Sequence, residues 1–178
     1  MTTRTHRARS GQPDRRARLV VAAGALLFAA ACPPPPNFLD GSIKESHDLS
    51  FDKVEVRFFP EQATFEVAYF KELSDDGSTG VDTVAKLVFA QPEGGVVVDE
   101  PITLDPAVDV MDRVTADQDV FPGLREGEVT FSAPAAVGET TAGEFSTTFT
   151  NGKTLNGGFE GELLSCSFDT EDVCGSGA

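Results

Sequence analysis

The chain has 178 residues and a formal net charge of −15, with 29 acidic residues against 14 lysines and arginines. Residues 1–31 hold six arginines and one aspartate, a net charge of +5, so the other 147 residues carry −20. A surface this acidic repels nucleic acids and anionic lipid headgroups, and we exclude nucleic acid as a partner. The remaining length is typical of one domain that buries a core of its own.

The first 31 residues have the parts of a secretory signal peptide. Six arginines precede an uncharged run of 13 residues from Leu19 to Ala31. A membrane-spanning helix needs about 20 apolar residues, and the prolines at 33–36 would stop a helix from continuing. The pattern therefore predicts a cleaved export signal over residues 1–31 rather than an uncleaved anchor. The pair Arg15-Arg16 lacks the surrounding consensus of a twin-arginine signal.

The end of this segment, Ala29-Ala30-Ala31-Cys32, resembles the lipobox of bacterial lipoproteins. The resemblance implies a thioether lipid on Cys32, cleavage before it, and acylation, as with palmitate, of the new amino terminus. Ala29 stands where that family usually has leucine or another branched residue, so an ordinary signal with an A-x-A cleavage site remains an alternative. Sorting patterns of the family imply the outer membrane, because Pro33 rather than aspartate follows Cys32.

Residues 32–44 are expected to be the lipidated cysteine and a linker, in which Pro33–Pro36 favour an extended polyproline conformation. A single β domain is expected over 45–178. Thirteen phenylalanines and no tryptophan follow residue 31, so phenylalanine should fill much of its core.

Two hairpins are predicted in the first half of this domain. Residues 54–58 and 65–69 alternate apolar and polar side chains, and the loop at 60–63 would place Phe58 opposite Phe65. Residues 83–90 and 96–104 are rich in valine and flank a Gly-rich turn at 92–95, which predicts a second hairpin. Residues 105–121 fit either a helix capped by Asp105 or a strand, and their valines favour the strand.

The last third predicts strands at 128–133, 144–149 and 153–164. A three-residue loop at 150–152, with Gly152 left-handed, pairs Phe149 with Lys153 and keeps the apolar residues on one face. That face carries Phe145, Thr147, Phe149, Leu155, Gly157, Phe159, Gly161 and Leu163. About seven or eight short strands predict an all-β fold, either an antiparallel β-sandwich or a partly open barrel. The segments 41–59 and 143–163 resemble parts of small predicted bacterial lipoproteins of unknown function, which implies no activity.

If Cys32 carries the lipid, two cysteines remain. Cys166 and Cys174 enclose a nine-residue segment, CSFDTEDVC, near the end of the chain. An even, closely spaced pair in an exported protein predicts a disulfide bond. The spacing of a redox-active C-x-x-C pair is absent from the sequence.

The sequence offers few residues for catalysis. His47, the one histidine after residue 31, lies beside Asp48 and is expected to be a surface or strand-edge residue rather than a general base. Motifs of serine hydrolases, zinc proteases and phosphate-binding loops are absent. We therefore expect a protein that is not an enzyme and needs no cofactor.

Calcium is the one specific ligand that the acidic residues suggest. Asp75, Asp76 and Asp82 form one cluster, and a second is formed by Asp105, Asp109, Asp112, Asp117 and Asp119. Calcium takes six to eight oxygen ligands, but neither cluster has EF-hand spacing, so we expect solvated turns.

These observations predict an exported, lipid-anchored, non-enzymatic module of the cell envelope with a structural or binding role. Its contacts would be the membrane, through the lipid, and an envelope protein or polysaccharide. Two alternatives remain: a calcium-dependent adhesion or matrix module, and an exported hydrolase without a recognisable motif.

Overall fold

A computed structural model describes residues 35–73, 80–167 and 174–175, so Cys32, Asp75 and Asp76 lie outside the described residues. The predicted all-β class is confirmed. The elements in chain order are β1 (Phe38–Asp40), the 3-10 turn η1 (Ser42–Glu45), β2 (Lys53–Phe59), β3 (Thr64–Leu73), β4 (Gly80–Ala90), β5 (Pro101–Thr103), β6 (Val110–Val114), β7 (Leu124–Phe131), β8 (Thr140–Phe149), β9 (Thr154–Cys166) and β10 (Cys174–Gly175).

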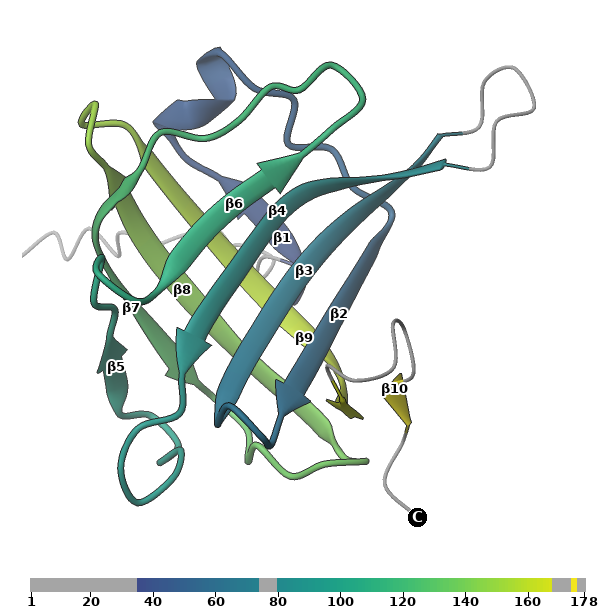
Figure 1. The fold of residues 1–178 in the computed structure, drawn as a ribbon, viewed down its shortest axis with the longest axis vertical. Coiled ribbons are helices and arrows are strands. Elements are labelled where there is room, and N and C mark those ends of the chain that lie inside the picture. The colour runs from purple at the N-terminus through teal and green to yellow at the C-terminus, as the bar shows by residue number, and fades with distance from the viewer. Residues whose placement is uncertain (1–34, 74–79, 168–173, 176–178) are drawn as a thin grey trace, which may run out of the picture. The chain divides into compact units, whose positions relative to one another are not determined.

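The strands form one curled sheet, a half-barrel that corresponds to the partly open barrel among the predicted folds. Its main path runs β5-β7-β8-β9-β2-β3-β4-β6, so the sheet ends at β5 and at β6. In Figure 1, β6, β4, β3 and β2 lie in front of β7, β8 and β9. One pair differs from the expected antiparallel arrangement, because β2 and β9 run parallel, with Val56 opposite Leu163. A parallel pair needs a long connection, and here most of the domain lies between the two strands.

The longest strand, β9, joins both ends of the domain. Along its first half it pairs with β8 and β1, and near its end it pairs with β2 and β10. The expectation of a linker up to residue 44 is wrong for β1, because Phe38–Asp40 lies opposite Asn156–Gly158. Ile43 in η1 is fully buried, so burial of an apolar side chain, together with the strand pairing, holds this segment to the domain.

The first predicted hairpin is confirmed, since Phe58 lies opposite Phe65 across the turn at 60–63. The second is wrong: β4 pairs with β3 and β6, while β5 pairs with β7. Val97 and Val98, which would have continued the hairpin, are 51% and 36% exposed. The place beside β4 is taken instead by β6, which buries Met111 in the core. The strand preferred for the 105–121 region is therefore present, as β6.

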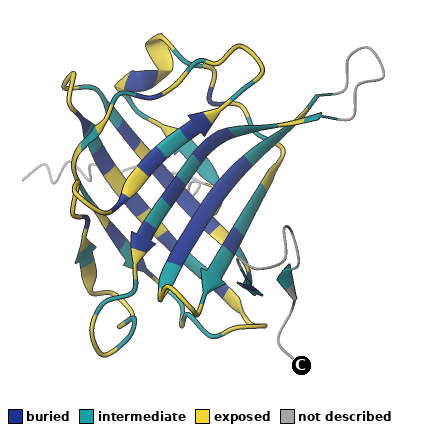
Figure 2. Ribbon diagram, in the orientation of Figure 1, coloured by how far each residue is buried: buried dark blue, intermediate teal, exposed yellow. Residues whose placement is uncertain are grey.

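The predicted C-terminal hairpin is confirmed in its register and its loop. The Phe149 N–H donates to the Lys153 carbonyl at 2.8 Å, and Gly152 has φ +81°. The large apolar side chains of the predicted inner face are at most 4% exposed; they are Phe145, Phe149, Leu155, Phe159 and Leu163. Figure 2 shows the resulting buried stripes on β8 and β9.

In the core between β8 and β9, two phenylalanines lie opposite glycines of the neighbouring strand. Phe145 lies opposite Gly157, and Phe159 lies opposite Gly143. A Cβ added at Gly157 would lie 2.4 Å from the Phe145 ring, so the ring occupies the space that a side chain would need. Four rings with centroids 5.5–6.2 Å apart extend this packing across the half-barrel, namely those of Phe65, Phe89, Phe131 and Phe159.

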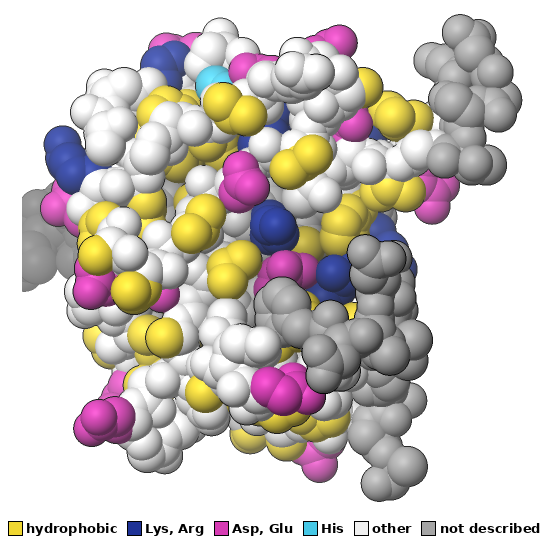
Figure 3. Space-filling view, viewed as in Figure 1, with side chains coloured by type: hydrophobic (Ala, Val, Ile, Leu, Met, Phe, Trp, Pro, Cys, Tyr) yellow, Lys and Arg dark blue, Asp and Glu magenta, His cyan; other side chains and the backbone are white. Residues whose placement is uncertain are grey.

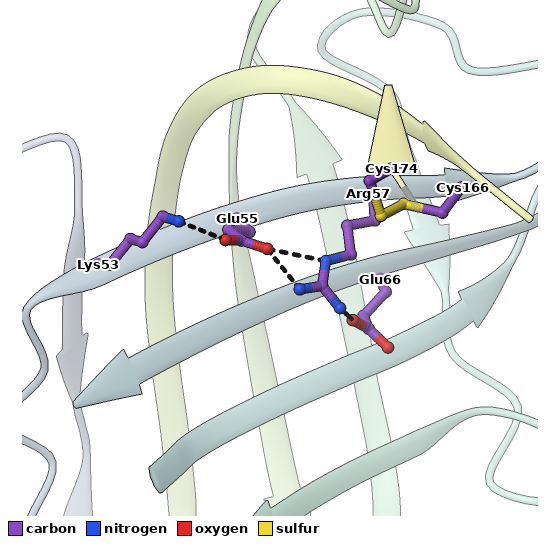
Figure 4. The surroundings of a disulfide bond; sticks show 6 residues. All are labelled: Lys53, Glu55, Arg57, Glu66, Cys166 and Cys174. Atoms are coloured by element: carbon purple, nitrogen blue, oxygen red, sulfur yellow. Dashed lines mark hydrogen bonds and ion pairs between the residues drawn. A yellow bond between two sulfur atoms is a disulfide. The ribbon is translucent and has the colours of Figure 1, made fainter. Parts of the chain in front are cut away.

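Charged side chains and a disulfide lie together on β2, β3 and β9 (Figure 4). The Arg57 guanidinium donates to Glu55, and its Nη1 donates to Glu66 Oε1 at 3.0 Å. Lys53 Nζ lies 2.5 Å from the other Glu55 carboxylate oxygen. The predicted disulfide between Cys166 and Cys174 is present, with 4.2 Å between the two Cα atoms, and it ties β10 to the end of β9.

Candidate functional site

His47 is not the surface residue that the sequence predicts. Its side chain is 9% exposed, and Nε2 lies 3.3 Å from Asp119 Oδ1 and 3.4 Å from the Val120 carbonyl oxygen. The ring contacts Phe121 edge-on, with 5.1 Å between the ring centroids. His47 thus holds the segment after η1 against the chain between β6 and β7. Both ring nitrogens face groups of the protein, which does not suit a general base that must reach a substrate.

Arg113 lies beside this contact and also serves the packing of the domain. Its side chain is 7% exposed, and Nη1 donates to the carbonyls of Asp48 and Val84 at 3.0 and 2.9 Å. The guanidinium carbon lies 5.7 Å from the Phe121 ring centroid, in the range of a cation–π contact. Nε donates no hydrogen bond and lies 3.7 Å from Asp119 Oδ2. Sequence reasoning did not single out Arg113.

A pocket of about 290 Å³ opens next to Arg113 and is lined by ionised groups, including Lys71, Asp48 and Asp117. Lys71 Nζ donates to Asp48 at 2.7 Å. This bond, with those from Ser50, holds the pKa of Asp48 far below its usual range, and it raises the pKa of Lys71. A carboxylate that stays ionised and paired is a poor proton donor or acceptor near neutral pH, so Asp48 is unsuited to general acid or base catalysis.

The candidate calcium ligands lie in two places: Asp82, Asp117 and Asp119 line the pocket beside Arg113, whereas Asp105 and Asp109 line a pocket at the other end of β4. Asp82 accepts the Ala116 N–H, and Asp112 accepts the Arg113 N–H. Asp109 is 7% exposed and lies at the other end of β4, where its two oxygens accept the N–H groups of Ala90 and Asp105. Among the described residues, no three His, Cys, Asp or Glu side chains are grouped so that they could hold a metal ion.

The site that better supports a binding function lies between the two end strands of the sheet, β5 and β6. A pocket of about 420 Å³ lies between β5 and the region where β4 ends and β6 begins. Its apolar lining includes Val97, Ile102 and Val108. Its acidic lining includes the exposed Glu93, Glu100 and Asp105, together with the buried Asp109. We call this pocket and its rim the seam.

Asp109 builds one wall of the seam. By accepting the Ala90 and Asp105 N–H groups, it joins the end of β4 to the turn before β6. The hydrogen bonds that it accepts stabilise this carboxylate in its buried position. Sequence reasoning counted Asp109 among calcium candidates and missed the seam, because the pocket arises from pairing between distant strands and carries no periodic signal.

Two of the exposed valines, Val97 and Val108, line the seam pocket, whereas Val114 lies at the other end of β6, opposite Thr83. Eight large hydrophobic side chains are exposed in the described residues, and six of them lie between residues 97 and 120, namely Val97, Val98, Val108, Val110, Val114 and Val120. Figure 3 shows hydrophobic side chains on the face that carries β4 and β6. The stretch 91–112 also contains six acidic residues and no lysine or arginine. An exposed apolar surface with one sign of charge is typical of a binding site.

A second hollow, of about 410 Å³, lies over β7, β8 and β9 and has no large apolar side chain in its lining. It is lined by Glu126, Gly127, Glu128, Ser146, Thr147, Thr148, Thr154 and Asn156. This hollow adjoins the seam at β5, because Glu128 lies opposite Thr103, which lines the seam pocket. Exposed carboxylates farther along the sheet, on β8 and β9, are useful as a control for the effect of overall charge; they are Glu144, Glu160 and Glu162.

Comparison with known protein families, with curated proteins and with solved structures finds no match. Within the part of the chain that the structure describes, no helix has the length and hydrophobicity needed to span a bilayer. The function must therefore be argued from the residues of this chain.

Proposed function

We propose that this chain is an exported lipoprotein, anchored through Cys32 to the outer membrane, and that its half-barrel is a non-enzymatic module that binds a partner protein of the cell envelope. The observation that carries the binding role is the seam, where two edge strands, a pocket and exposed valines meet. The bilayer contact rests on the sequence before Cys32. The Cys166–Cys174 bond supports export, because disulfides persist in oxidising compartments.

The rigid scaffold supports a binding role in a second way. Phe89 of β4 and Met111 of β6 are buried in the phenylalanine-rich core, so these two strands beside the seam are held in place. A surface that does not have to be ordered on binding loses less conformational entropy when a partner docks.

The lipid anchor is tested by replacing its attachment residue. The Cys32→Ser variant should remain uncleaved, or its domain should be released into the soluble fraction, because no lipid can be attached. The measurement is membrane fractionation with mass spectrometry of the mature chain. If the variant partitions with membranes at the same mature mass as the wild type, lipidation at Cys32 is wrong.

The binding role is tested by photo-crosslinking in intact cells. A photoreactive amino acid at Val108, which is 66% exposed at the seam, should capture a discrete partner band. The matched control is Val81, which is 61% exposed at the opposite end of β4 and should capture none. Equal labelling at both positions, or no band at Val108, would contradict a partner at the seam.

A further inference from the structure

We infer that the seam recognises an extended, basic segment of its partner, with a lysine or arginine side chain entering the pocket while the backbone runs beside the free edge of β6. This inference rests on the proposed function and names the chemistry of the partner. It is carried by the charge of the seam, the apolar lining of its pocket and the open edge of the sheet.

The negative charge of the seam favours a cationic ligand. Glu93, Glu100 and Asp105 are exposed around the pocket, and the described residues include no lysine or arginine paired with any of them. Carboxylates that lack a local counter-charge favour a positively charged ligand and repel an anionic one. A polyanion such as a nucleic acid or an acidic glycan is therefore disfavoured.

The apolar lining of the pocket favours a cation that is carried on an aliphatic stem. Val97, Ile102 and Val108 line the same pocket as the carboxylates. Lysine and arginine bury their methylene stems against apolar surface while the charged head stays near water or a carboxylate. A bare metal ion would gain nothing from the valines, and the described residues do not group the oxygens that it needs.

The edge of β6 favours a bound segment with an extended backbone. Among the strands that the structure describes, β6 pairs with β4 alone, and the main path of the sheet stops there. An unpaired strand edge presents N–H and C=O groups that an added strand can use, with side-chain pockets supplying specificity. The exposed Val108 and Val110 lie at the start of this edge, next to the pocket, and would contact apolar side chains of the added strand.

A second copy of this chain does not fit as the occupant. The 147 residues after residue 31 carry −20, with eight lysines and arginines against 28 acidic residues. Two acidic seams facing each other would repel. In the proposed function, cleavage removes the chain's own basic stretch, residues 1–31, so the basic segment comes from another protein.

The experiment is a titration of the full-length protein, purified in a neutral detergent, with fluorescent ten-residue peptides. A peptide of alternating valine and lysine should bind, and peptides of valine with glutamate or with glutamine should not. Binding should weaken as salt rises, because exposed charges are screened. Spermine, a cation that cannot form a strand, should compete poorly; if it displaces the peptide at equal concentration, the role of the edge is overturned.

Two pairs of variants locate the contact. The triple variant Glu93→Gln/Glu100→Gln/Asp105→Asn should weaken binding about tenfold, since three exposed charge pairs together supply about that factor. Glu144→Gln/Glu160→Gln/Glu162→Gln removes the same charge from exposed positions on β8 and β9 and should change affinity less than about twofold. Val108→Arg should abolish binding, and Val81→Arg should not.

The outcomes separate this inference from the proposed function. A partner crosslinked at Val108, together with peptide binding that both triple variants weaken equally, would leave the binding role standing and overturn the seam as the basic-peptide site. A partner captured at Val108 without any binding of the valine–lysine peptide would overturn the basic segment alone. Failure of capture at Val108 would overturn the proposed binding role itself.

Discussion

Gly152 ends the loop between β8 and β9 with φ +81°, and nothing lies within 4 Å of the place where its Cβ would be. The constraint at this residue is therefore the backbone conformation and not the space around it. Left-handed backbone is open to glycine, tolerated by asparagine, and strained for β-branched residues.

Gly152→Val should lower the free energy of unfolding by about 1–3 kcal/mol, because valine is forced into left-handed backbone. Gly152→Asn is the matched control and should cost less than about 1 kcal/mol. Urea denaturation of both variants measures the difference. Equal stability of the valine variant and the wild type would mean that the loop does not have this conformation.

His47 shows how a single residue can be misjudged from its neighbours in sequence. The neighbouring Asp48 suggested an exposed position, but the ring packs against Phe121, which lies 74 residues further along the chain. That contact depends on where the chain after β6 returns, and no local pattern reports it.

His47→Ala should destabilise the domain by about 1–3 kcal/mol, since a largely buried ring and its polar contacts are lost. The comparison is Lys44→Ala, which removes an exposed ion pair with Asp40 and should leave the free energy of unfolding almost unchanged. Thermal or urea unfolding gives both values. An effect of His47→Ala as small as that of Lys44→Ala would restore the interpretation of His47 as an incidental surface residue.

At the scale of elements, β8 and β9 accommodate each other's rings: Gly157 of β9 lies opposite Phe145, and Gly143 of β8 lies opposite Phe159. Gly157 faces Phe145, whereas a Cβ at Gly161 would meet only Val56 Cγ2, at 3.9 Å. The two glycines lie on one strand, and both were predicted to face inward, yet only Gly157 is required by a close ring.

Gly157→Ala should destabilise by about 1–3 kcal/mol through overpacking, and Gly161→Ala should be nearly neutral. In a Phe145→Leu background the smaller side chain leaves room, so the cost of Gly157→Ala should fall by about 1 kcal/mol or more. Urea unfolding of the wild type, the Gly157→Ala and Phe145→Leu single variants and the double variant tests the contact between residues 145 and 157. Purely additive effects would contradict it.

Hairpins were predictable where their turns and strands are adjacent in sequence. The turn at 60–63 and the loop at 150–152 each fix a register that the alternating side chains then confirm. The predicted hairpin around 92–95 was wrong because Gly94 and Gly95, both with positive φ, turn a chain whose following valines remain exposed. Valine content reports the ability to form a strand and does not say which strand will be its neighbour.

For the whole molecule, the pairings that close the fold are the ones that sequence did not reveal. β1 pairs with β9 and β2 lies parallel to β9, although each pair is separated by about a hundred residues of chain. The seam follows from the same long-range pairing, because it exists only where β5 and β6 fail to meet. Its acidic composition was visible in the sequence, whereas its position between two edge strands was not.

The ion pairs of β2 and β3 make stability depend on pH. Burial of Glu55 opposes its ionisation, but hydrogen bonds from Lys53 and Arg57 outweigh this, so the pKa of Glu55 lies below its usual value. A group whose pKa is lower in the folded state stabilises the protein above its unfolded pKa, and that contribution is lost as the pH falls through the folded pKa.

Glu55→Gln should therefore lower the free energy of unfolding at pH 7 by about 1–2 kcal/mol, because Arg57 and Lys53 lose a charged acceptor. As the pH falls below about 4, the usual pKa of a glutamate, the wild type loses the same contribution and the difference from Glu55→Gln should shrink. Urea unfolding of both proteins at a series of pH values measures this difference. Comparing the two proteins cancels the general relief of carboxylate repulsion, which acts on both at low pH. A difference that stayed constant from pH 7 down to pH 2 would show that the Glu55 carboxylate does not stabilise this sheet through its charge.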